Sequence, residues 1–120
     1  MLKKNKNYTI PRLVKIFGGS AQSSMPFVKG KVPYCKFNPK INPEFPNTAW
    51  IEEGPIRKRG AEFLIKCNTK IPVFKKIGIN KWAFIGNAWV SDGTTLKGLK
   101  KINKNPPRNK VQIILKFNFK

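Results

Sequence analysis

The chain has 120 residues, of which 40% are apolar and 12% aromatic, so it is long enough for one packed domain and too apolar for a disordered basic tail. Lys and Arg number 25 against 5 Asp and Glu, and His is absent, which gives a formal charge of +20. Such an excess repels itself in a compact chain and attracts polyanions. We therefore expect a polyanionic partner, with a merely solvated surface as the alternative.

No apolar run reaches the ~20 residues of a membrane span, and no signal-peptide core follows the first Met. We expect an intracellular or nuclear protein, or one packaged within a virus particle, that is not secreted and binds no membrane. Without His, Cys35 and Cys67 cannot complete a structural zinc site. Intracellular redox conditions disfavour a disulfide between them, so both are expected to be reduced.

Residues 1–8 are predicted to form a basic, mobile arm, and residues 9–120 a single β-rich domain. A short helix should follow the arm, with Thr9 as N-cap and Gly18 as C-cap. Prolines then recur from Ser20 to Pro55, which excludes long helices and central strands there. Because aromatic and aliphatic residues are interleaved with these prolines, we expect an ordered, extended layer that wraps the core.

Short strands are predicted for residues 63–67 and 71–77, followed by a turn at 78–81. A third strand opens at Trp82, with Trp82 and Trp89 on opposite faces. Trp82 is expected in the core, and Trp89 on the exposed face.

The last third of the chain contains one ambiguous segment and one clear strand. Ser91-Asp92-Gly93 should turn the chain, and residues 94–104 fit either a short basic helix or a loop. Alternation over residues 111–120 indicates a strand. Together the elements predict a mainly β (α+β) fold, in which a short N-terminal helix and the proline-rich wrap cover a small curved sheet or partly open barrel.

Several segments resemble an uncharacterised domain family that is widespread in fungi and has no assigned activity. The similarity covers about residues 12 to 92 and rests on Gly18-Gly19-Ser20-Ala21-Gln22, Met25-Pro26, Asn38-Pro39, Asn42-Pro43, Pro46, Val73-Phe74 and Lys81-Trp82-Ala83-Phe84-Ile85-Gly86. The stretch from Pro72 to Gly86 also looks like the β-hairpin of PUA-like readers of modified DNA, and like a module attached to some DNA helicases and HNH nucleases. That likeness implies a curved, barrel-like sheet and DNA binding.

The residue types argue against catalysis. Without His, the usual general base and the common nucleophile pairs are absent. Glu52 and Glu53 are adjacent, so in an extended segment they point in opposite directions and fit ion pairs with nearby cations better than a metal site. Gly18-Gly19 lacks the Lys-Ser/Thr of a phosphate-binding loop. We expect no enzyme, cofactor or metal.

Basic clusters recur along the chain and supply the candidate nucleic-acid contacts. A rigid turn after Gly54-Pro55 is expected to present Arg57 for phosphate or base-edge contact, the alternative being a solvated loop with ion pairs. Lysines elsewhere are point charges suited to phosphates, and an exposed Trp can stack on a base. The candidate contacts are Arg57, Lys58, Arg59, Lys75, Lys76, Lys81, Trp89, Lys97, Lys100, Lys101 and Lys104.

The sequence thus predicts a non-catalytic nucleic-acid-binding domain that acts mainly through phosphate contacts, with DNA favoured over RNA. A reader of DNA, in which an aromatic-lined pocket takes a flipped or modified base, is a more specific form of this prediction. The alternative is a basic structural component of a virus particle or ribonucleoprotein that assembles with other proteins. It would neutralise a polyanion or dock on an acidic protein.

Overall fold

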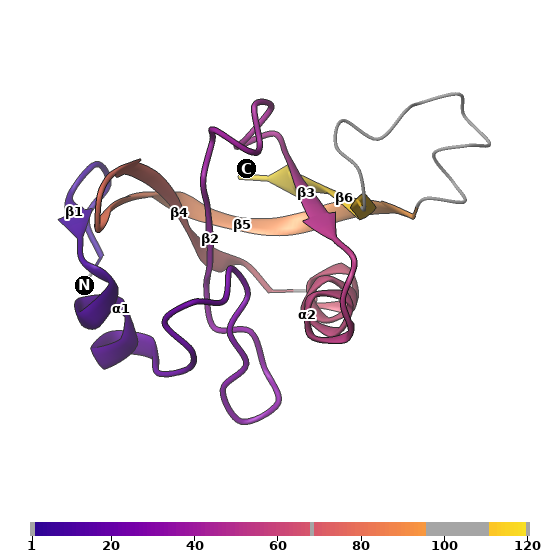
Figure 1. The fold of residues 1–120 in the computed structure, drawn as a ribbon, viewed down its shortest axis with the longest axis horizontal. Coiled ribbons are helices and arrows are strands. Elements are labelled where there is room, and N and C mark those ends of the chain that lie inside the picture. The colour runs from indigo at the N-terminus through magenta and orange to yellow at the C-terminus, as the bar shows by residue number, and fades with distance from the viewer. Residues whose placement is uncertain (1, 68, 96–110, 120) are drawn as a thin grey trace.

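The fold is a six-stranded mixed sheet with two helices, seen in a computed structural model that describes residues 2–67, 69–95 and 111–119. The elements are β1 (Asn7–Tyr8), α1 (Ile10–Phe17), β2 (Cys35–Phe37), β3 (Thr48–Glu52), α2 (Pro55–Lys66), β4 (Ile71–Gly78), β5 (Lys81–Thr95) and β6 (Val111–Asn118). Figure 1 shows β4 and β5 as a curved pair, with α1 and α2 beneath it near opposite ends.

The strands follow the order β2-β4-β5-β6-β3, and β1 pairs with β5 outside this path. β2 pairs with β4 in parallel, and the other pairings are antiparallel. Within the described residues β2 and β3 do not pair with each other, so the sheet stays open. The predicted curved, mainly β sheet is therefore confirmed, and it is not closed into a barrel.

Helix α1 begins and ends where its local sequence signals place it. The Thr9 hydroxyl accepts the Arg12 amide at 3.3 Å, and the Asn80 side-chain oxygen, in the turn between β4 and β5, accepts the Ile10 amide at 2.7 Å. The helix ends at Gly18, whose φ of +82° disfavours any residue with a Cβ. Leu13 is buried. The predicted short helix is confirmed.

Helix α2 overturns two predictions, the turn that was to present Arg57 and the strand at 63–67. Pro55 occupies the first turn, and the buried Gly60, Ala61 and Leu64 recur at the spacing of one helical face. That face packs against β3, β5 and β6. A short apolar run such as 63–65 is compatible with either a strand or a helix, and the helical spacing of the residues before it favours the helix here.

Strand β5 is longer than predicted. The expected turn at Ser91-Asp92-Gly93 is wrong, because the strand runs on to Thr95 with a register irregularity between Val90 and Asp92. A bulge of this kind bends a strand without ending it. Thr94 and Thr95 belong to β5, and the rest of the ambiguous 94–104 segment lies outside the described residues. The strand predicted at the C-terminus is confirmed as β6.

The proline-rich segment wraps the core as predicted. Between residues 20 and 54 the described elements are β2 and β3, both at sheet edges. The larger core cluster lies between the sheet, α2 and this segment, and includes Met25, Phe37, Phe45, Leu64 and Leu115. The smaller cluster packs α1 against the turn end of β4 and β5, and consists of Tyr8, Leu13, Tyr34, Phe74, Trp82 and Phe84.

Gly19 illustrates how tightly the wrap is packed. A Cβ on Gly19 would lie 2.8 Å from the Pro26 Cβ, and the residue has a φ of +83°. Gly19→Ala should therefore lower the free energy of unfolding by about 2–3 kcal/mol, from backbone strain plus overpacking. Gly30→Ala is the matched control, because Gly30 has a φ of +78° but no atom within 4 Å of the added Cβ. If chemical denaturation gave equal losses of unfolding free energy for the two variants, Pro26 would be able to move away from the added Cβ at no energetic cost.

Candidate nucleic-acid interface

Acidic residues are confined to one part of the molecule. Glu44 precedes β3, and Glu52 is the last residue of that strand. Glu53 lies just before α2, Glu62 lies within α2, and Asp92 is in the second half of β5. The opposite end, made by residues 2–17 and 74–84, contains no acid. We call these residues the hairpin end; Figure 1 shows β1, α1 and the β4–β5 turn together, away from α2 and β3. Its cations are Lys3, Lys4, Lys6, Arg12, Lys15, Lys75, Lys76 and Lys81.

Strand pairing makes the hairpin end rigid. Gly78 pairs with Lys81, and Tyr8 of β1 pairs with Trp82 of β5. The Asn5 amide donates to the Phe84 carbonyl at 2.9 Å. The Tyr8 ring is buried, and its hydroxyl accepts the Lys3 amide at 3.0 Å. Hydrogen bonds and a buried tyrosine therefore connect this segment, predicted as a mobile arm, to the sheet.

Cationic groups at this end lie over aromatic rings. The Lys6 ammonium and the Arg12 guanidinium lie 5.7 and 5.8 Å from the centre of the Tyr8 ring. The Lys36 and Lys76 ammonium groups lie 5.7 and 5.9 Å from the Trp82 ring. For Lys6, Arg12 and Lys76, attraction to the ring faces positions the charge while leaving N–H groups available to an anion. Trp82 is buried, as predicted, so it supports cations and is not itself exposed for stacking.

Lys36, on β2 outside the hairpin end, is buried and was not among the predicted contacts. Its side chain is 3% exposed, and its ammonium donates to the Ser23 carbonyl. Burial lowers the pKa of Lys36 from 10.5 to about 8, while the electrostatic interaction with Cys35 partly opposes the shift. Burial also raises the pKa of the Cys35 thiol and of the Tyr34 phenol. No sequence pattern marks Lys36, because its burial depends on the folding of the wrap over β2.

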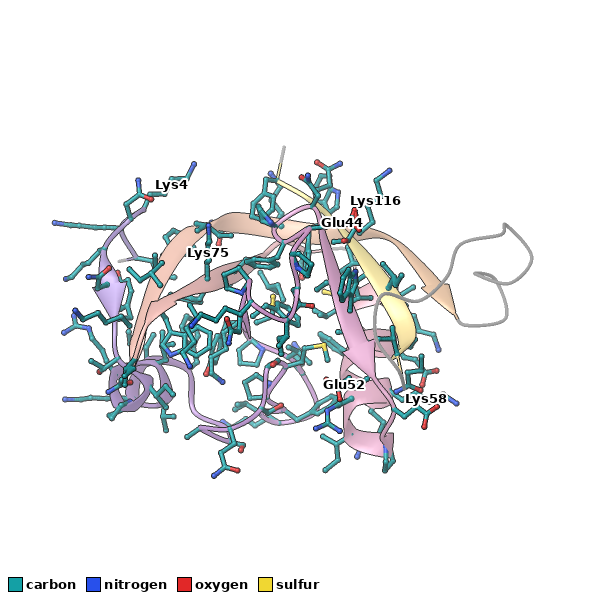
Figure 2. The ribbon with its side chains drawn as sticks, turned by 45° about the horizontal axis from the view of Figure 1, so that its top comes forward. Lys4, Glu44, Glu52, Lys58, Lys75 and Lys116 are labelled. Carbon is teal, nitrogen blue, oxygen red and sulfur yellow. The ribbon has the colours of Figure 1, made fainter. Side chains whose placement is uncertain are left out.

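The predicted contacts divide between the two ends. Lys75 and Lys76 are half-buried and Lys81 is exposed, all at the hairpin end. The exposed Arg57, Lys58 and Arg59 lie on α2, and Figure 2 shows Lys58 far from Lys75. The Arg57 guanidinium donates to the Glu53 carbonyl at 3.1 Å, and that of Arg59 lies 5.0 Å from the Phe27 ring. The predicted contacts Lys97, Lys100, Lys101 and Lys104 lie outside the described residues.

Unlike the buried Trp82, Trp89 is exposed, as predicted. It is 38% exposed, and the Lys70 ammonium lies 5.0 Å from its ring. A half-exposed indole beside a cation can stack on an unpaired base while the cation contacts a phosphate. Lys70 was not among the predicted contacts, although its position just before a predicted strand would have been a usable signal.

A cleft of about 530 Å³ lies between the wrap, β3 and the start of α2, and includes Trp50 and Arg57. Its polar side chains are largely engaged with the backbone. The side-chain oxygen of Asn42 accepts a hydrogen bond from the Trp50 backbone amide at 2.8 Å, and its side-chain nitrogen donates to the Asn38 carbonyl at 3.1 Å. The Ser23 hydroxyl accepts a hydrogen bond from the Met25 backbone amide at 3.2 Å. The cleft therefore offers few uncommitted groups for reading a base edge.

No protein-family model, curated protein or solved structure matches this chain. The two resemblances noted from the sequence therefore stay predictions.

Both cysteines are free thiols, Cys35 buried and Cys67 half-buried. In the described part of the chain, no three His, Cys, Asp or Glu residues are placed to hold a metal ion. Neither helix there is long and apolar enough to cross a bilayer.

Proposed function

We propose that the protein is a non-catalytic nucleic-acid-binding domain that contacts phosphates through its hairpin end. The observation that carries the proposal is the separation of charge: every acid lies elsewhere, and the hairpin end presents only cations on a backbone fixed by strand pairing. An ordered backbone pays no further ordering cost when the domain binds, and each phosphate contact releases counterions from the nucleic acid.

The chemistry of the groups favours weak sequence preference. Most cations of the hairpin end are lysines, which act as point charges and contact phosphate more readily than a base edge. A two-stranded β-ribbon also fits a groove of duplex DNA, which supports DNA over RNA as the partner.

Two triple variants test the proposal, because each removes the same number of cations from a different end. One carries Lys75→Gln, Lys76→Gln and Lys81→Gln; the control carries Arg57→Gln, Lys58→Gln and Arg59→Gln. If about six lysines contact duplex DNA, the slope of log affinity against log salt should be about −5 for the wild type. It should become shallower by about 2–3 in the hairpin variant and stay unchanged in the α2 variant.

The measurement is fluorescence anisotropy of a labelled mixed-sequence duplex between about 50 and about 200 mM salt. Binding that scarcely changes with salt would contradict the proposed function. Binding that weakens most in the α2 variant would move the interface to the Arg57 cluster.

A second candidate is the basic structural component of a virus particle or ribonucleoprotein. Exposed cations outside the hairpin end, such as Lys29, Lys31, Lys40 and Lys66, favour it, because a packing role needs charge on several faces. In that case both triple variants should lose the same affinity. Plain DNA, modified DNA, RNA and heparin should also bind alike, whereas a reader would prefer one modified base.

A further inference from the structure

Ile79 is an apolar side chain held out in solvent at the tip of the hairpin end. It is 93% exposed, in the turn that joins β4 to β5, and Ile77 two residues earlier is 50% exposed. A single exposed apolar residue is ordinary on a protein surface. Here it lies in the turn of the hairpin end, which contains cations and no acid.

The tip is rigid as well as exposed. Asn80, with a φ of +51°, accepts the Ile10 amide through its side chain, which ties the turn to the start of α1. The Lys81 side chain runs alongside Gly78, with its Cδ 3.4 Å from where a Gly78 Cβ would lie. The turn is therefore braced from both sides, and Ile79 is presented in a fixed position.

A partner that buries Ile79 must combine a negative exterior with an apolar interior. Duplex DNA has this combination, with phosphates outside and stacked bases within, and proteins that bend DNA insert single apolar side chains between base steps from the minor groove. We propose that Ile79 is such a wedge, entering between two adjacent base pairs of duplex DNA while Lys75, Lys76 and Lys81 contact the flanking phosphates. This inference rests on the proposed function.

An anionic bilayer also has a negative surface over an apolar interior. However, two exposed isoleucines bury little apolar area, and stable membrane attachment needs a stronger apolar anchor together with a basic surface. The space between two adjacent base pairs therefore matches the size of Ile79 better than a bilayer does.

The test measures DNA bending by fluorescence energy transfer between dyes at the two ends of a short duplex. The wild type should bring the ends closer, and Ile79→Ala should abolish the bend. Affinity should fall about tenfold, in line with the loss of one buried aliphatic side chain. The salt slope should not change, because no charge is removed. Ile56→Ala is the matched control, since Ile56 is 63% exposed on α2, and it should alter neither bending nor affinity.

A duplex with a central mismatch gives a second readout. Its bases are already partly unstacked, so the wild type should bind it more tightly than matched duplex, and Ile79→Ala should lose that preference. Salt-dependent binding without bending, or bending retained by Ile79→Ala, would overturn the wedge and leave the proposed function intact. Absence of salt-dependent DNA binding would overturn both. Attachment to anionic vesicles that depends on Ile79, without DNA bending, would identify a membrane partner instead.

Discussion

Phe74→Ala should lower the free energy of unfolding by about 3–5 kcal/mol, which is a large part of the total for a domain of this size. The Phe74 ring is fully buried in β4. Its centre lies 5.6 Å from the Tyr8 ring, 5.7 Å from Tyr34, 5.6 Å from Phe84 and 6.1 Å from Phe17. Removing it empties the middle of the smaller core cluster, and four rings from separate segments of the chain cannot all move to fill the space.

Chemical denaturation compares this variant with Phe119→Ala. Phe119 is half-buried and lies 6.4 Å from the Phe117 ring, so its loss should cost about 1 kcal/mol. Equal costs for the two variants would show that the smaller cluster relaxes around the missing ring. The hairpin end would then owe its shape to strand pairing more than to its core.

Lys36→Met should stabilise the protein at pH 7 by about 1–3 kcal/mol, because methionine fills similar space without a buried charge. The difference in unfolding free energy between variant and wild type should narrow at high pH. In the folded protein the pKa of Lys36 is about 8, below its ordinary 10.5. The unfolded chain therefore binds more protons between these values, and the stability of the wild type gains on that of the variant as pH rises from 8 to 10.5.

Two neighbours work in the opposite direction. The pKa values of the Cys35 thiol and the Tyr34 phenol are raised by burial, so both groups favour the unfolded state once the pH exceeds their ordinary values of 9.0 and 10.0. Both are present in wild type and variant, and Cys35 interacts electrostatically with Lys36, so the difference between the two proteins reports Lys36 together with that interaction.

Denaturation at intervals from pH 7 to pH 10 gives that difference. Lys40→Met, at an exposed loop position, controls for the loss of one positive charge. If Lys36→Met were less stable than wild type at pH 7, the contacts of the ammonium with the Ser23 carbonyl and with the Tyr34 and Trp82 rings would outweigh the cost of burial.

The sequence predicted those elements whose signals are local. Thr9 and Gly18 bound α1, and strict alternation marked β6, because capping and side-chain alternation act over a few residues. Helix α2 was not predicted, because Gly60 weakens the helical pattern. A glycine fits there because Met25 of the wrap packs closely against this position. Tertiary packing decided that segment.

Only part of the candidate interface was predicted, again because the sequence reveals local patterns and not tertiary packing. Lys75, Lys76 and Lys81 surround a recognisable turn, so a local pattern located them. Arg12 and Lys36 join them only through β1–β5 and β2–β4 pairing, which connects residues far apart in the chain. The absence of acids at that end was visible in the sequence, but its meaning required knowing which segments meet in space.

β5 has a mechanical consequence for the molecule. Its first half pairs with β4 and β1, and its second half with β6. One continuous backbone thus runs from the turn that carries Ile79 into the larger core beside α2. We expect a displacement of the tip to be passed along this strand to the residues that pair with β6.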